Sequence, residues 1–489
     1  MTAPHNLRRL TRHSAIYGLG DLVARLLGVL LLPLYTAYLS PADYGKIEIL
    51  IAASAVLLVV LRRGVSEGFF RFYFDSPDAT HHRTVIRTTF WFTMATATVA
   101  LVLATAFAEP LSHALQLGDE PDLVRAAAVG LWAQMNYTQL TVVLRAEERS
   151  FQFVIATLAN VLITIAVTVL LVVVLDRGPL GALIGAFAGT LVVYAVLLVL
   201  RRADLGFEFD RPLLRAMNKF GTPLIPAALG LWAISFADRW FIAVLEDQTE
   251  VGVYSVAVRV ASAVALLQLA FRRAWPAFAY SIEDDRDART TYARVLTYVI
   301  LVTSWVALGL TLLAPWLVRL LTSQPEFYRA ADAVGPLAFS AVAYAGFSVI
   351  SIGSGRSRRT QGNWVVAGLG AFVNVALCFA LIPSYGMIGA AVATLAAYVV
   401  LFLGMVVYAG RVFPVTYEWR RVITAVAVAA GLAVLGSSAS PPLAVAIAVA
   451  AVFPIALAPI GFYRPGELEG IRRLVSSRSG RSGRHQQGE

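Results

Sequence analysis

The chain has 489 residues, of which 58% are hydrophobic and 14% are charged, and its formal net charge is +10. Soluble domains contain roughly 45–50% apolar residues and about a quarter charged residues, so this composition excludes an ordinary soluble protein and predicts an integral membrane protein. The polar loops are too short to form a basic patch on a folded domain, and we expect no nucleic-acid partner. Cys378 is the only cysteine and the six histidines lack ligand spacing, so no disulfide, metal or cofactor site is predicted.

Apolar runs long enough to span a bilayer recur along the whole chain, and each is expected to be helical. The first extends from about 13 to 39. It contains Asp21 and Arg25 and has no small-residue cleavage pattern, which favours a retained helix over a signal peptide. The other predicted spans are 45–61, 86–108, 123–143, 151–175, 179–200, 217–245, 251–271, 295–318, 330–352, 363–383, 387–409, 422–437 and 441–462. The sequence thus predicts an all-α integral membrane protein with about 14 transmembrane helices.

The basic residues indicate how these helices are oriented. When successive loops are assigned to alternate sides of the membrane, one side receives roughly six times as many Lys and Arg residues as the other. The positive-inside rule then places both termini in the cytoplasm. The outer loops are short, and the longest, near 109–122, is too small to hold a catalytic domain.

An internal repeat relates the two halves of the chain. An acidic turn closes on glycine after the first span, at 39–45, and after the seventh, at 245–252, while spans five and eleven carry Asn160 and Asn374. The copies are an even number of spans apart and share one orientation. We therefore expect two six-helix lobes related by a pseudo-two-fold axis along the membrane normal, with a site at their interface. The predicted units are a first lobe at 1–210, a second at 211–410, two extra helices at 411–463 and a basic disordered tail at 464–489.

Charged residues inside the apolar spans are the candidate site. One Asp or Arg at the centre of a membrane helix costs roughly 2.5–3.5 kcal/mol, so such residues persist where they face protein, water or a ligand. The candidates are Asp21 and Arg25 in the first span, Asp238 and Arg239 in the seventh, and Arg259 in the eighth. The first and seventh spans are expected to face each other across the lobe interface.

Each candidate also has a plainer interpretation. Asp21 and Arg25 are four residues apart on one helix and could simply neutralise each other. Asp238 points about 100° away from Arg239 on a helix, which favours a structural or gating ion pair near the outer leaflet over a substrate contact. Arg259 has no acidic neighbour one turn away, so a cavity-facing or interlobe role is favoured.

A second group of basic residues follows the second span. Arg63 and Arg71 flank the aromatic segment 66–70 on the predicted cytoplasmic side. They are candidates for the place where an anionic head group enters. The alternative is that they are ordinary positive-inside charge.

Several short motifs resemble those of one bacterial transporter family. They are Pro41–Gly45 after the first span, Phe220–Pro223 at the entry to the seventh, the Asp238-Arg239 pair, and Val251–Tyr254. Together they resemble the polysaccharide and O-antigen flippases of the multidrug/oligosaccharidyl-lipid/polysaccharide flippase superfamily. The resemblance covers essentially the whole chain. It implies a transporter, not an enzyme, that moves an undecaprenyl-pyrophosphate-linked saccharide across the cytoplasmic (inner) membrane by alternating access, for synthesis of surface polysaccharides such as the O-antigen of lipopolysaccharide.

The intramembrane arginines suit such a substrate. A diphosphate crossing a low-dielectric layer needs fixed cations, and a guanidinium offers a planar two-pronged donor to phosphate oxygens. We therefore predict substrate binding by Arg25 and Arg259, with Asp21 and Arg239 beside them, and a gating role for Asp238. Outward movement of an anion gains about 2.3 kcal/mol per charge and 100 mV. Membrane lipids are expected partners. Coupling of transport to a proton or a sodium ion is an additional possibility that the sequence does not decide.

Other functions remain as alternatives. A multidrug or organic-cation antiporter of the same superfamily should carry uncompensated carboxylates, whereas here the arginines match or outnumber the acids. A polymerase or ligase of envelope glycans would need a larger outer loop. A lipid II flippase is disfavoured because the sequence shows no clear groove on the last helices.

Overall fold

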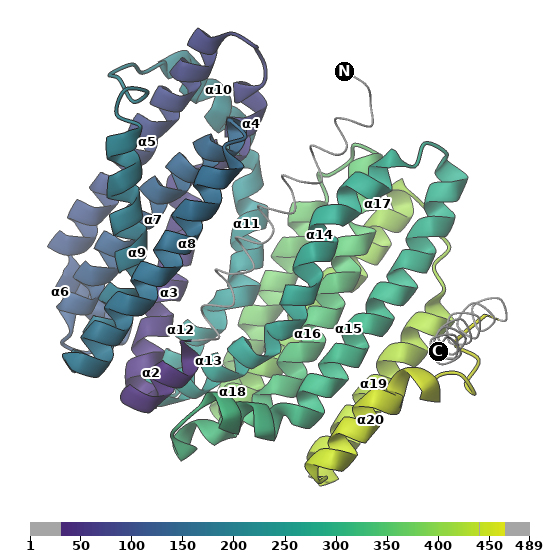
Figure 1. Ribbon diagram of the computed structural model, residues 1–489. Coiled ribbons are helices and arrows are strands. Elements are labelled where there is room, and N and C mark those ends of the chain that lie inside the picture. The colour runs from purple at the N-terminus through teal and green to yellow at the C-terminus, as the bar shows by residue number, and fades with distance from the viewer. Residues whose placement is uncertain (1–30, 440, 465–489) are drawn as a thin grey trace, which may run out of the picture.

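The computed structural model describes residues 31–439 and 441–464, and every regular element in these ranges is a helix. The predicted all-α membrane fold is confirmed. Figure 1 shows two helical bundles side by side, with a separate pair of helices, α19 and α20, at the far edge of the second bundle. Asp21 and Arg25, and most of the predicted first span, lie outside the described residues.

The first bundle is built from five long helices and several short ones. The long helices are α3 (Pro41–Arg62), α5 (Ala79–Ala106), α7 (Pro121–Ala146), α8 (Ser150–Val169, continued by the π-helical turn η1, Leu170–Val174) and α9 (Gly178–Leu200). The short helices are α2 (Leu32–Tyr38), α4 (Val65–Tyr73) and α6 (Ala108–Ala114). α7 packs against α3, α5, α8 and α9, and can therefore carry the polar side chains Asn136 and Gln139 in a buried position.

The second bundle begins with a helix that is broken several times. Its parts are α10 (Arg211–Gly221), η2 (Thr222–Leu224), α11 (Ile225–Trp232), the π-helical turn η3 (Ala233–Ala237) and α12 (Asp238–Leu245). The elements that follow are α13 (Gln248–Ala261), α14 (Ala263–Ser281), α15 (Asp285–Leu321), η4 (Pro325–Arg329), α16 (Ala330–Ile350), α17 (Ile352–Arg356) and α18 (Asn363–Val412). α10 packs on α4 and α5, whereas α11 and α12 pack on α18, so this broken helix contacts both bundles.

The helix count can be compared with the sequence only in part. Within the described residues, ten helices are long and apolar enough to cross a membrane. α18 covers two predicted spans, which meet at Gly386, where φ is 52° and ψ is −134°. The total of fourteen is not established, because most of the first span is not described, α7 is not among the ten, and α20 is short.

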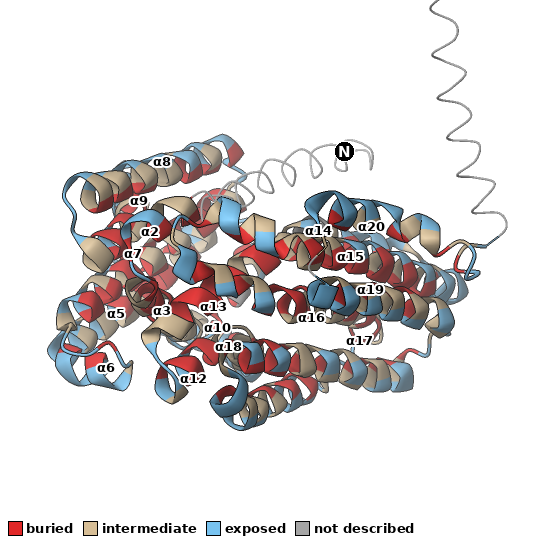
Figure 2. Ribbon diagram, turned by 90° about the horizontal axis from the view of Figure 1, so that it is seen from below, coloured by how far each residue is buried: buried red, intermediate tan, exposed pale blue. Residues whose placement is uncertain are grey.

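Apolar side chains cover much of the outside of the bundles. Phe151 and Leu162 on α8 are 77% and 65% exposed, and Phe372 on α18 is 70% exposed. Figure 2 shows the exposed residues on the outward faces of the helices and the buried ones facing other helices. Such a surface suits contact with lipid, where each helix satisfies its own backbone hydrogen bonds.

The last two helices are attached to the second bundle by packing on α15 and by the carboxylate of Glu418. They are α19 (Trp419–Ala439) and α20 (Leu443–Ala456), and both pack on α15. Glu418 accepts hydrogen bonds from Thr297 of α15 at 2.9 Å and from Arg421 at 2.7 Å, and also pairs with Arg464. The two C-terminal helices therefore form a distinct layer with its own attachment.

The bundles meet through two equivalent helix starts, α3 and α13. Ser40 caps α3 by accepting a hydrogen bond from the backbone N–H of Asp43, and Asp247 caps α13 by accepting one from that of Glu250. The helices then cross with their backbones in contact at Gly45 and Gly252. The two equivalent turns of the predicted repeat therefore lead into helices that contact each other, with Gly45 against the start of α13 and Gly252 against the start of α3. The described crossing joins the second and eighth predicted spans, whereas the first and seventh were expected to face each other.

Candidate functional site

A cluster of buried charges lies at this junction, just beyond the glycine crossing. Glu48 on α3 accepts a hydrogen bond through Oε1 from Arg259 Nη2 on α13 at 2.5 Å. Its other oxygen, Oε2, lies 3.6 Å from Arg239 Nε on α12. The Glu48 and Arg239 side chains are 6% and 5% exposed, and that of Arg259 is 22% exposed. One carboxylate of the first bundle therefore joins two arginines of the second.

Asp238 balances the same cluster from within the second bundle. Its Oδ1 lies 3.2 Å from Arg239 Nη1, and its Oδ2 accepts hydrogen bonds from the Tyr254 hydroxyl and, at 3.4 Å, from Thr394. Arg239 also donates to the Ser235 carbonyl, in the π-helical turn η3, at 3.0 Å. A π-helical turn widens a helix and often marks a functional position. Asp238 thereby links α12 to α13 and α18.

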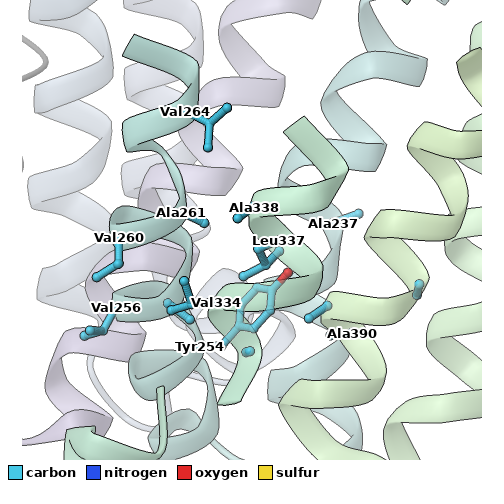
Figure 3. Close-up of a cluster of buried hydrophobic side chains, with 14 of the residues drawn as sticks. Ala237, Tyr254, Val256, Val260, Ala261, Val264, Val334, Leu337, Ala338 and Ala390 are labelled. Carbon is cyan, nitrogen blue, oxygen red and sulfur yellow. The ribbon is translucent and has the colours of Figure 1, made fainter. Parts of the chain in front are cut away.

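The surroundings of the cluster are apolar. Figure 3 shows the Tyr254 ring among Val334 and Leu337 of α16 and Ala390 of α18. The Arg259 guanidinium lies over the Tyr44 ring at 5.6 Å, and that of Arg239 over Phe236 at 5.2 Å. In such a low-dielectric setting an unpaired charge is costly, so breaking any one of these pairs has a large effect.

The structure brings some of the predicted residues together and separates others. Arg239 and Arg259 meet on Glu48, and Asp238 pairs with its neighbour Arg239 as well as with other helices. Arg63 and Arg71 are exposed and lie beyond the other end of α3. Arg63 ends that helix with φ at 47°, and Arg71 on α4 places its guanidinium 5.0 Å from the Phe220 ring centre.

Glu48 was missed by the sequence-based reasoning, although it lies inside the predicted span 45–61. An acid inside this span, followed by an apolar run from Ile49, carries the same kind of cost as the five residues that were selected. Its partner could not be found from the sequence, because Arg259 is 211 positions away.

A groove lies between the second bundle and the C-terminal helices. It has a volume of about 1030 Å³ and is lined mainly by apolar side chains of α15, α16, α18 and α19. Arg319 and Asp332 line it where α15 ends and α16 begins, and Trp419 lines it where α19 begins. The sequence-based expectation of no groove on the last helices was therefore wrong. The groove forms between segments that are far apart in the chain, so the sequence of any one of them does not indicate it.

The fold is that of the multidrug/oligosaccharidyl-lipid/polysaccharide transporters, as comparison with solved structures shows. The lipid II flippase MurJ in an inward closed conformation matches with a TM-score of 0.72 and 13% identity, over 92% of this chain and 99% of that one. An inward-facing multidrug resistance MATE family transporter matches with a TM-score of 0.68 and 14% identity, over 80% and 95%. A MATE transporter of Vibrio cholerae matches with a TM-score of 0.56 and 13% identity, over 83% and 96%.

The family model described as polysaccharide biosynthesis protein matches residues 37–325, and the chain belongs to this family. No curated protein is similar enough in sequence to match. The resemblance drawn from the short motifs is thus confirmed for family and fold, and the protein is a multi-pass membrane protein with the fold of known transporters and flippases.

Proposed function

We propose that the protein is a flippase that moves an undecaprenyl-pyrophosphate-linked oligosaccharide from the inner to the outer leaflet of the bacterial cytoplasmic membrane. The oligosaccharide would serve surface polysaccharide synthesis, and the two bundles would alternate in their access to each side. Both termini would lie in the cytoplasm, on the side of the arginine-rich loops. The observation that carries this proposal is the pair of buried arginines, Arg239 and Arg259, at the junction of the bundles.

Two arginines that are largely buried between the bundles suit a diphosphate. The guanidinium group stays charged in apolar surroundings and forms paired hydrogen bonds with phosphate oxygens. Arg239 is held by the Ser235 carbonyl and by Asp238, and Arg259 by Glu48, so both guanidinium groups are positioned before a ligand arrives. Arg25 and Asp21, in the predicted first span, would add to this site.

The groove supports a lipid-linked substrate in particular. Its lining is apolar and it is bounded by helices whose outer faces suit lipid, so a polyprenyl chain could lie there while the head group moves between the bundles. Arg63 and Arg71 would attract the head group on the cytoplasmic side, where their side chains are exposed.

A multidrug or cation antiporter is the second candidate, because the fold is shared with multidrug transporters. The charge pattern favours it less. In the described part of the chain, the two carboxylates at the junction, Glu48 and Asp238, both contact arginine. An organic cation would have to compete with a guanidinium for each of them.

The test is a binding titration with protein reconstituted in nanodiscs. Undecaprenyl pyrophosphate carrying an oligosaccharide and an organic dye cation are titrated against the wild type, Arg25→Ala, Arg259→Ala and the control Arg125→Ala, whose partner Asp122 lies one turn away on α7. Loss of a charge-assisted contact of about 1.5–3 kcal/mol predicts roughly 10- to 150-fold weaker lipid binding for the first two variants alone. Dye binding that survives both variants and fails in Asp21→Asn would identify a cation antiporter instead.

A further inference from the structure

We propose that Glu48 occupies on Arg259 the place that the phosphate of the substrate takes, so that substrate binding releases the two bundles from each other. This inference rests on the proposed function and assigns a role to a residue that the sequence motifs did not include. In the structure, Glu48 acts as a built-in substitute for the anionic ligand. Its replacement by the ligand would couple binding to movement.

The contact joins opposite bundles. Glu48 belongs to α3 and Arg259 to α13, which are the two helices that cross at Gly45 and Gly252. The ion pairs that we identify across the junction, within residues 31–439 and 441–464, are Glu48–Arg259 and Glu48–Arg239. The other cross-junction contacts include neutral hydrogen bonds, such as Trp232 to the Ala52 carbonyl at 3.1 Å and Gln324 to the Leu39 carbonyl at 3.3 Å. Among the described residues, Glu48 is therefore an anion through which charge holds the bundles together.

The different exposures of Arg259 and Glu48 indicate that an anion can replace Glu48 more easily than a cation can replace Arg259. The Arg259 side chain is 22% exposed and the Glu48 side chain 6%. An incoming anion can therefore approach the guanidinium, whereas a cation would have to displace Arg259 before it reached the carboxylate. A phosphate presents oxygens to a guanidinium in the same way as a carboxylate, and a diphosphate carries more negative charge, so it can take the place of Glu48.

The released carboxylate would not be stranded in an apolar interior. Arg239 Nε is already 3.6 Å from Glu48 Oε2 and can hold the carboxylate until the bundles part and water enters. Arg239 keeps Asp238 as a partner within its own bundle after the separation. Each charge of the cluster thus has a partner or water in both arrangements, which keeps the barrier to the exchange low.

The test measures opening and binding together. Spin labels at Asp119→Cys in the first bundle and Glu326→Cys in the second report the distance across the junction, in a Cys378→Ala background that removes the single native cysteine. The reconstituted protein is measured alone, with undecaprenyl pyrophosphate and with undecaprenol, which lacks the diphosphate. In the wild type, we expect only the diphosphate to lengthen the distance.

The decisive variant is Glu48→Gln, with Glu48→Asp as a second variant that keeps the charge but withdraws it from Arg259. Glu250→Gln is the matched control, because Glu250 pairs with Arg329 within the second bundle. We expect Glu48→Gln to favour the longer distance without ligand and to bind undecaprenyl pyrophosphate at least tenfold more tightly, with the control unchanged.

The outcomes separate this inference from the proposed function. If the wild type binds undecaprenyl pyrophosphate through Arg259, while Glu48→Gln changes neither affinity nor distance, the exchange is refuted and the flippase proposal stands. If the wild type binds neither undecaprenyl pyrophosphate nor the form that carries an oligosaccharide, both are refuted. An increase in distance with undecaprenol alone would also refute the exchange, since no anion would then be needed.

Discussion

Gly45 of α3 and Gly252 of α13 each lie against the backbone of the other helix. A Cβ atom on Gly45 would overlap the carbonyl oxygen of Gln248, and one on Gly252 would overlap that of Pro41. The two contacts are reciprocal: each glycine stands four residues after the residue whose carbonyl the other approaches. This close crossing brings Glu48, about one turn beyond Gly45, within reach of Arg259, about two turns beyond Gly252.

Gly45→Ala is therefore expected to push the bundles apart at this junction. The added methyl group meets backbone, which cannot rotate away, so the strain is relieved by separating α3 from α13. Spin-label distances across the junction should lengthen without ligand, and transport should fall. Gly368→Ala is the control, since a Cβ atom there meets nothing within 4 Å. A folded Gly45→Ala protein with wild-type distances would contradict the expectation.

Tyr254→Phe should destabilise the second bundle. The change removes a hydroxyl that donates to the buried carboxylate of Asp238, which is 1% exposed. Leaving a buried acceptor without this donor costs about 1–3 kcal/mol, and more where the acceptor is charged. Thermal unfolding followed by tryptophan fluorescence should show a lower Tm. Tyr385→Phe, at a tyrosine that is 64% exposed, should leave Tm unchanged, and an equal loss in both variants would argue against the role of the Asp238 contact.

Ala430→Trp should obstruct the groove. Ala430 lines it from α19, and an indole there would occupy space that we assign to the polyprenyl chain. Transport of an undecaprenyl-linked oligosaccharide should fall severalfold, whereas one linked to a much shorter prenyl chain should be moved at the wild-type rate. Leu435→Trp, at a 68% exposed position of α19 outside the groove lining, is the control. Equal loss with both chain lengths would show that the groove does not hold the lipid.

A fall in pH should destabilise the linker between the two bundles, residues 203–210. Hydrogen bonds from Thr84 and Arg87 lower the pKa of Glu208 below its ordinary value of about 4.3. Because the folded pKa is depressed, the stabilisation is present above the ordinary value and is lost as the pH falls toward the lower, folded one. Hydrogen exchange of the backbone at 203–210, corrected for the intrinsic rate, should rise over that range. Glu208→Gln should exchange faster already at neutral pH and show no such step, so equal protection in both proteins at pH 7 would contradict this.

The sequence by itself determined the membrane class, the helical fold and the family. Hydropathy is a local property and a lipid environment leaves few choices of backbone structure, so spans such as 45–61 and 179–200 could be placed without tertiary contacts. Arg239, Arg259 and Asp238 could also be identified from the local sequence, because a charge inside an apolar span carries a free-energy cost. The same argument applies to Glu48, which could have been identified too.

Only the tertiary structure decided how these charges pair. Arg259 has no acidic residue one turn away on its own helix, and its partner Glu48 stands in the other bundle. The groove likewise needs α15, α16, α18 and α19 together, none of which carries a distinctive pattern alone. The physical reason is the same in both cases: the free energy of a charge or a cavity depends on what surrounds it, and those neighbours come from distant parts of the chain.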